Sequence, residues 1–207
     1  MNLLLDIISP LPEFLVFDDN KIIISRKIVE SADTKLSESI IPSFLKIDKT
    51  LNLSKNLKSL IVTTGPGSYT ALRVGVSFIM GQFYSNNVKL AALSGKDILN
   101  FLKISGKKNY GIYLTSANNQ RFVCYKLCNK NYKEVKIESN KFDEFEDLGL
   151  IDILYYNEKI LNKKNLNNLK QIKFTIKNTI IKNYFNLKYT KRSIIKPVYI
   201  SNNYKLN

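Results

Sequence analysis

The sequence of 207 residues contains no histidine, and this absence removes several kinds of chemistry. A serine or cysteine nucleophile activated by histidine cannot be built, and neither can a His-Glu-x-x-His zinc site. Catalysis by carboxylates or by lysine stays open, but it would have to draw on only 17 acidic residues. We therefore predict that the chain has no catalytic residue, no bound metal and no cofactor.

Cysteine and long apolar runs are also scarce. The two cysteines, Cys124 and Cys128, are four residues apart in a strand-like stretch. We expect them on the same face, too far apart along it for an easy disulfide, as reduced thiols in a cytosol. No apolar run reaches the roughly 18–20 residues of a membrane span, and residues 1–17 lack the basic start of a secretion signal. These features predict a cytoplasmic protein without membrane contact.

The formal net charge is +15, which favours a polyanionic partner such as tRNA. Four basic residues are arginine, so lysine supplies the other 28 of the 32, scattered along a chain also rich in asparagine and isoleucine. This pattern is typical of a bias toward AT-rich codons, whereas phosphate-binding sites more often use arginine. We therefore expect the chain itself to bind RNA only weakly and without specificity.

The hydrophobic pattern predicts an α/β protein. Strands are expected at residues 3–5, 14–17, 22–28, 59–64, 88–93, 110–116, 121–127, 132–138, 151–156 and 197–200, and helices at 34–46, 69–84, 94–102 and 178–187. Pro42 predicts a kink or an early end of the first helix, and Ser94 and Asp97 have capping-box spacing. The strand–helix alternation after residue 59 predicts parallel strands, and strands 110–138 an antiparallel meander. A boundary near residues 105–108 divides the chain into an N-terminal lobe, 1–105, and a smaller C-terminal lobe, 106–207.

One segment is more informative than the rest: Gly-Pro-Gly-Ser-Tyr-Thr-Ala-Leu-Arg-Val-Gly at residues 65–75. Gly65, Pro66 and Gly67 predict a tight turn, and Ser68 a cap on the helix that follows. The segment is not a P-loop, because no Gly-Lys-Ser/Thr follows the turn. It is not a dinucleotide-binding fingerprint either, because Thr70 stands where the third glycine belongs.

Small residues recur every four positions in this helix, at Gly67, Ala71 and Gly75, and they predict a groove without side chains. An interior glycine costs a helix about 1 kcal/mol relative to alanine, and close approach of another backbone is the usual compensation. Packing inside the same lobe and contact with a partner helix are both open explanations. Under the second, the partner interface consists of Gly67, Ser68, Ala71, Leu72 and Gly75.

Residues 65–75 resemble the Gly-Pro-Gly-Ser-Phe-Thr-Gly-Leu-Arg-Ile-Gly signature of the TsaB (YeaZ) family. Residues 37–42, 93–94 and 197–202 are similar to further family segments. The resemblance implies a two-lobed actin-like (ASKHA-type) fold with mixed sheets flanked by helices. It also implies a non-catalytic subunit that binds and supports a TsaD-like transferase in threonylcarbamoyladenosine modification of tRNA next to the anticodon. A TsaE-like ATPase, tRNA reached through the complex, and a homodimer of the isolated chain are the other partners that it implies.

Two alternatives stay open beside this interpretation. The first is a small ASKHA-type ATPase or kinase, which needs a polar, glycine-containing phosphate hairpin after its first aspartate. Here Asp6 is followed by Ile-Ile-Ser-Pro-Leu-Pro, which has no glycine and lacks two backbone N–H donors. We therefore expect Asp6 to end a strand rather than to hold magnesium. The second alternative is a basic RNA-binding module, for which clustered arginines or an aromatic platform would be needed.

Overall fold

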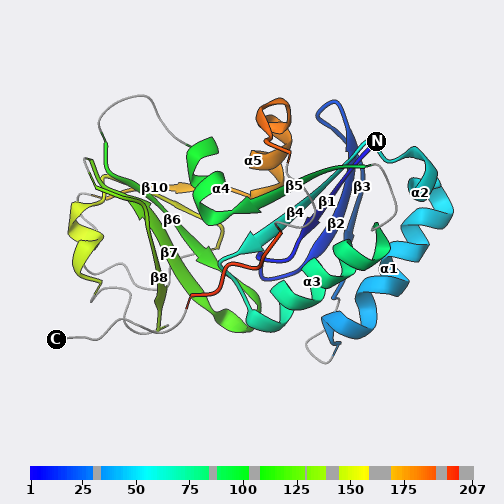
Figure 1. Ribbon diagram of the computed structural model, residues 1–207. Coiled ribbons are helices and arrows are strands. Elements are labelled where there is room, and N and C mark those ends of the chain that lie inside the picture. The colour runs from blue at the N-terminus through cyan, green and yellow to red at the C-terminus, as the bar shows by residue number, and fades with distance from the viewer. Residues whose placement is uncertain are drawn as a thin grey trace.

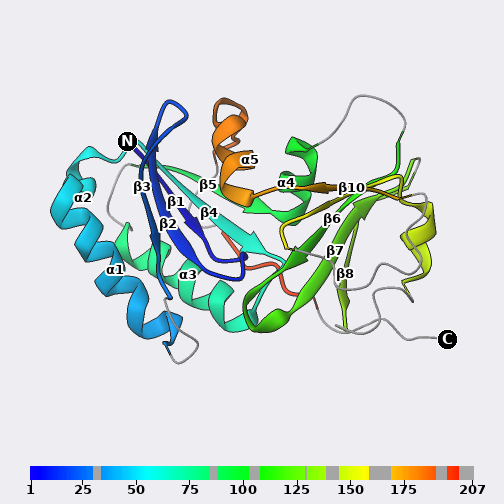
Figure 2. The same ribbon diagram turned by 180° about the vertical axis from the view of Figure 1, so that it is seen from behind.

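The computed structural model describes residues 1–29, 34–83, 88–102, 108–128, 130–138, 145–158, 169–189 and 195–200. Two five-stranded mixed sheets lie side by side, and each takes its strands from one half of the sequence (Figures 1 and 2). Helices cover both faces of the first sheet. The predicted fold class, two lobes with mixed sheets flanked by helices, is thereby confirmed.

The first sheet has the strand order β3-β2-β1-β4-β5. Its strands are β1 (Asn2–Asp6), β2 (Glu13–Asp18), β3 (Lys21–Lys27), β4 (Ser59–Gly65) and β5 (Lys89–Ser94). The first three strands are antiparallel, whereas β4 runs parallel to both β1 and β5. The parallel pairing of β4 with β5 confirms the prediction from the strand–helix alternation. Every residue of β1 and β4 is buried, which is typical of central strands that are covered on both faces.

Helices α1 (Leu36–Leu51) and α3 (Tyr69–Gln82) pack against each other on one face of this sheet, with the short α2 (Leu53–Asn56) after α1. Helices α4 (Gly95–Phe101) and α5 (Ile176–Lys182) lie on the opposite face (Figure 2). The capping box of Ser94 and Asp97 is confirmed. The early end predicted at Pro42 is wrong, because Pro42 is exposed and the buried Ile40, Phe44 and Ile47 hold the helix on both sides of it.

The second sheet has the order β10-β9-β6-β7-β8. Its strands are β6 (Tyr110–Thr115), β7 (Arg121–Lys126), β8 (Lys133–Ile137), β9 (Ile153–Tyr156) and β10 (Lys170–Lys173). The antiparallel meander β6-β7-β8 is confirmed, while β9 runs parallel to β6 and β10 parallel to β9. Strand β10 was not predicted. Short 3₁₀ helices are η1 (Ala117–Asn119), η2 (Glu146–Leu150) and η3 (Tyr184–Asn186).

The chain after β10 returns to the first sheet. The predicted helix at 178–187 is α5 followed by η3, and the Tyr184 hydroxyl donates to the Asn2 side chain of β1 at 2.9 Å. The strand predicted at 197–200 is wrong. This segment makes one backbone bond to the end of β4, from Val198 N–H to Thr64 O at 2.7 Å, and no ladder. Most of the expected lobe boundary, and the end of the helix predicted to reach Tyr84, lie outside the described residues, so the division 1–105 and 106–207 stays a prediction.

The largest hydrophobic cluster joins both sheets, and a second cluster lies around Tyr125 and Leu154 of the second sheet. Cys124 is buried in β7, and Cys128 is exposed beyond the end of that strand, so the expected shared face is not formed. Both cysteines are free, as predicted. Among the described residues, no helix is both long and apolar enough to cross a membrane.

Candidate functional site

The motif at residues 65–75 lies at the carboxyl end of β4 and forms the first turns of α3. Gly65 has φ +126°, and a Cβ on it would lie 2.5 Å from the carbonyl oxygen of Val198. Only glycine combines this backbone conformation with so close a neighbour. Pro66 is buried beside it. Ser68 occupies the N-cap position of α3, but its side chain makes no capping hydrogen bond, contrary to the expectation.

Gly75 of α3 and Gly67, just before the helix, face the loop that follows β1. A Cβ on Gly75 would lie 2.6 and 2.7 Å from the Cδ1 and Cγ2 atoms of Ile7. A Cβ on Gly67 would lie 3.2 Å from Cγ2 of Ile8. Both isoleucines are fully buried. The open groove expected on this helix is therefore wrong at these two positions, because side chains of the same lobe fill it.

The predicted interface residues are thus largely inside the molecule. Ala71 and Leu72 belong to the core, Ser68 and Gly75 are buried, and Gly67 is half-buried. Their assignment to a partner contact stays a prediction. Sequence reasoning missed Ile7 and Ile8 as the groups that fill the groove. The available signal was two consecutive isoleucines where a polar hairpin was expected.

The exposed face of the same helix has a different composition. Tyr69 is 55% exposed, and the Arg73 guanidinium lies over its ring at 5.3 Å. The Tyr199 ring, far away in the sequence, packs on Tyr69 with a centroid distance of 4.7 Å. On the neighbouring α1, Ile41 and Leu45 are 52% and 54% exposed. Two packed helices therefore present large apolar and aromatic side chains to solvent, together with an arginine.

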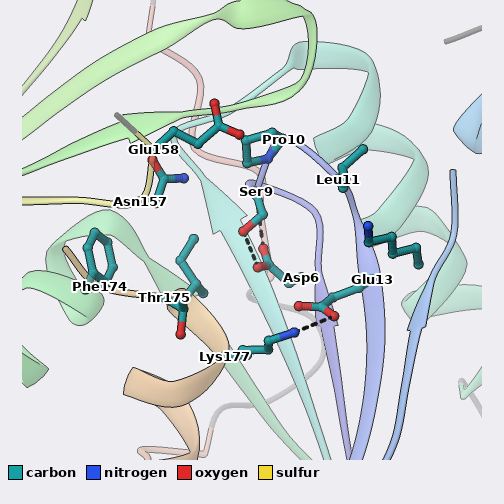
Figure 3. A pocket seen from close by; sticks show the side chains of 12 residues that line it. Asp6, Ser9, Pro10, Leu11, Glu13, Asn157, Glu158, Phe174, Thr175 and Lys177 are labelled. Carbon is teal, nitrogen blue, oxygen red and sulfur yellow. Dashed lines mark hydrogen bonds and ion pairs between the residues drawn. The ribbon is translucent and has the colours of Figure 1, made fainter. Parts of the chain in front are cut away.

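A pocket of about 220 Å³ opens between the two halves of the chain (Figure 3). The first half supplies β1, β2, the loop between them and the end of β3, and the second half supplies the residues that follow β9 and β10 and the start of α5. Eight of its twelve lining residues are charged or polar, and the other four are apolar. It is lined by Asp6, Ser9, Pro10, Leu11, Glu13, Lys27, Asn157, Glu158, Phe174, Thr175, Ile176 and Lys177.

Asp6 ends β1, as predicted, and its carboxylate is fully buried at the inner end of the pocket. One oxygen accepts from the Ile8 N–H at 3.1 Å, the Ser9 N–H at 3.2 Å and the Thr63 hydroxyl at 3.2 Å. The other accepts from the Ser9 hydroxyl at 2.5 Å. Burial raises the pKa of Asp6, and the hydrogen bonds from Ser9 and Ile8 oppose that rise. The acceptor capacity of Asp6 is therefore directed at its own loop and at Thr63 of β4.

An ion pair crosses the pocket between its two halves. Lys177 of α5 lies 3.2 Å from a Glu13 oxygen (Figure 3). The Ser25 hydroxyl donates to the same oxygen at 2.8 Å. This ion pair, which the sequence did not predict, ties β2 to α5. Among the residues that the structure describes, no group of three or more acidic or cysteine side chains is close enough to hold a metal ion.

Two mixed sheets with a pocket between them define a two-lobed actin-like protein, and solved structures agree with that class. An uncharacterized protein from Pseudomonas aeruginosa with similarity to peptidase YEAZ superposes with a TM-score of 0.61 at 12% identity, covering 97% of this chain and 99% of that one. YeaZ from Pseudomonas aeruginosa gives 0.58 at 12% identity, covering 96% and 99%. A Bacteroides thetaiotaomicron protein with an actin-like ATPase fold and unknown function gives 0.55 at 7% identity, covering 89% and 94%. At these identities the likeness is one of fold.

The sequence itself is matched by a family model. The model described as TsaD, tRNA N6-adenosine threonylcarbamoyltransferase, matches residues 22–194. The chain therefore belongs to this family, and the resemblance to its TsaB (YeaZ) members is confirmed. Among curated proteins, no sequence matches the chain.

Proposed function

We propose that this chain is a non-catalytic subunit that binds and supports a TsaD-like transferase in threonylcarbamoyladenosine modification of tRNA. The observation that carries the proposal is the use made of the loop after β1. An ASKHA-type ATPase needs this loop for nucleotide phosphates. Here Ile7 and Ile8 fill the space next to Gly75 and Gly67. Ser9 donates two hydrogen bonds to the Asp6 carboxylate, from its N–H and from its hydroxyl. Because this loop packs against α3 and binds Asp6, it supports a scaffolding role for the chain better than a role in binding nucleotide phosphates.

The contact with the TsaD-like partner is placed on the exposed face of α1 and α3. Ile41 and Leu45 supply apolar area, and Tyr69 with Arg73 supplies the residue types that dominate binding energy at protein interfaces. The predicted interface residues support this contact indirectly, by holding the backbone of α3 in position. They are Gly67, Ser68, Ala71, Leu72 and Gly75, of which Gly67 and Gly75 lie against the loop after β1.

The remaining partners follow from the same role. A TsaE-like ATPase joins the complex, tRNA is reached through it, and the isolated chain uses the same helical face to form a homodimer. All of this takes place in the cytoplasm. The family match to a tRNA-modifying transferase supports the link to tRNA, and the ATPase and the homodimer remain part of the proposal.

Reconstitution with the TsaD-like protein of the same organism tests the proposal. The chain alone should form no modified adenosine, and the assembly should. Ile41→Glu with Leu45→Glu should weaken the complex by tenfold or more, about 1.4 kcal/mol, because two charges enter an apolar contact. Leu150→Glu is the matched control, since Leu150 is a 49% exposed leucine in η2 of the other half.

Size-exclusion chromatography and calorimetry measure complex formation, and mass spectrometry of digested tRNA measures modification. A complex that survives the double substitution at full strength would place the interface elsewhere. Modification by the repurified chain alone would refute the non-catalytic role.

A further inference from the structure

The acidic residues of this chain are distributed very unevenly. All 17 of them lie between Asp6 and Glu158. The 49 residues after Glu158 contain twelve basic residues and no acidic one, so this quarter has a net charge of +12 and the first 158 residues have +3. A codon bias toward lysine would add lysine everywhere, but it would not remove aspartate and glutamate from one end. The asymmetry therefore indicates a polyanionic partner for this part of the chain.

The structure fixes the described part of this segment on the first sheet. Tyr184 packs edge-on against Phe17 at 5.4 Å and hydrogen bonds to Asn2, and Leu187 is buried. These inward residues are three apart, which is one turn of the 3₁₀ helix η3. Phe185 between them and Lys188 beside them are exposed. Figure 1 shows this orange segment beside β5.

The exposed side chains of the segment are aromatic and basic, and the Tyr189 hydroxyl turns back to Tyr184 and to Ser59 of β4. Phe185 is 72% exposed, the highest exposure among the large hydrophobic side chains described, and Tyr189 is 42% exposed. Lys182 and Lys188 stand three residues before and after Phe185, and both are exposed. Lys89, at the start of β5, lies over the Tyr189 ring at 5.6 Å. We call these five residues the carboxyl-terminal cationic patch.

The charge of the patch is not cancelled locally. Among the described residues after Glu158, Lys177 forms an ion pair with Glu13, and this pair lies on the pocket side of α5, away from the patch. An acid at this end of the sheet, Asp18, is already balanced by Lys58 at 3.8 Å and by the N-terminal ammonium at 3.9 Å. The patch therefore carries a positive potential that no described carboxylate neutralises.

We propose that the carboxyl-terminal cationic patch is an RNA-binding surface. Its lysines contact backbone phosphates, and Phe185 offers a face on which an unpaired base stacks. Nothing in the patch has the rigid donor pattern that reads a base edge, so binding is salt-dependent and tolerant of sequence. The proposal assigns to this patch the weak RNA binding that we expect from the composition. The choice of tRNA as the RNA rests on the function proposed above.

A protein partner fits the patch less well. Lysine is depleted in protein–protein interfaces, because its flexible, strongly hydrated ammonium loses entropy and hydration when it is buried. Exposed lysines without acidic neighbours beside an exposed ring are instead the combination found where proteins bind single-stranded nucleic acid.

Fluorescence anisotropy with an unmodified tRNA transcript, measured with the full chain from 50 to 200 mM salt, tests this proposal. Lys182→Gln with Lys188→Gln should reduce the slope of log affinity against log salt by about 2, that is about 1 per lysine. Phe185→Ala should weaken binding about tenfold at constant slope, because it removes stacking and no charge. Lys55→Gln with Lys126→Gln is the matched control, since it removes the same charge from exposed lysines of α2 and β7.

The control pair should leave both affinity and slope unchanged, and all variants should melt with the wild type because the side chains are exposed. A slope that falls equally in the control pair, or in neither pair, would overturn the proposal. So would variants that bind tRNA normally and lose the TsaD-like partner, because the patch would then be a protein surface. Failure of the wild-type chain to bind that partner would refute the proposed function alone, since the tRNA titration needs only this chain.

Discussion

At the residue scale, two glycines of α3 have opposite surroundings, and opposite effects of substitution follow. Gly75→Ala should lower the free energy of unfolding, because the new methyl group meets buried Ile7 atoms at 2.6–2.7 Å, and overpacking costs about 1–3 kcal/mol. The higher helix propensity of alanine offsets only about 1 kcal/mol of this cost. Gly81→Ala should raise the free energy of unfolding by up to about 1 kcal/mol, because no atom lies within 4 Å of the added Cβ. Urea unfolding of both variants measures the difference.

Stabilisation by both substitutions would show that Ile7 moves aside freely. The groove under α3 would then be available to a partner after all, and the predicted interface residues would regain their original explanation.

The same glycines show how far sequence reasoning reaches at a site. The motif predicted the turn at Gly65–Pro66–Gly67 and the start of the helix, because these depend on neighbouring residues. What fills the small positions depends on a loop about 60 residues earlier, and one sequence carries no signal for that pairing. The pairing of Glu13 with Lys177, which is 164 residues away, was out of reach for the same reason.

At the element scale, the segment 195–200 can lie against the end of β4 because Gly65 has no side chain. Gly65→Ala should release it, because the new Cβ would lie 2.5 Å from the Val198 backbone oxygen and φ is +126°. Tyr199 would then leave Tyr69, and chymotrypsin should cut after Tyr199 much faster than in the wild type. Gly149→Ala is the control, since an added Cβ meets nothing within 4 Å there. Equal cleavage of both variants would show that Tyr69 and the core hold the segment without Gly65.

Elements with a strong local pattern were predicted, and elements that depend on a distant partner were not. Strand β4 has an apolar run at Leu60–Val62 and α4 has a capping box, so both were found within a residue or two. Strand β10, Lys-Gln-Ile-Lys, has no apolar face and exists because β9 pairs with it. The segment 197–200 is apolar but makes a single backbone bond, which periodicity cannot distinguish from a ladder.

At the scale of the whole molecule, the second half of the sequence packs back onto the first sheet. Helix α5 and η3 cross back from β10, and the contacts of Lys177 with Glu13 and of Tyr184 with Asn2 fix them there. This return closes one side of the inter-lobe pocket and carries the cationic segment to the first sheet. The same crossover therefore accounts for both the closed pocket and the position of the patch.

Asp6, at the centre of this arrangement, gives the sharpest test of whether the pocket takes part in chemistry. Asp6→Asn should cost about 1–3 kcal/mol of stability, because an amide replaces a buried carboxylate that accepts four hydrogen bonds. In the assembly with the TsaD-like partner and the ATPase, however, the rate of tRNA modification at equal complex concentration should stay within about twofold of wild type, since Asp6 is engaged by Ile8, Ser9 and Thr63. Asp152→Asn is the control. Asp152 is an exposed carboxylate of the other half that accepts from the Asn109 N–H at 2.8 Å. Loss of modification with Asp6→Asn, in complexes that form normally and work with Asp152→Asn, would show that the pocket supplies a reacting group.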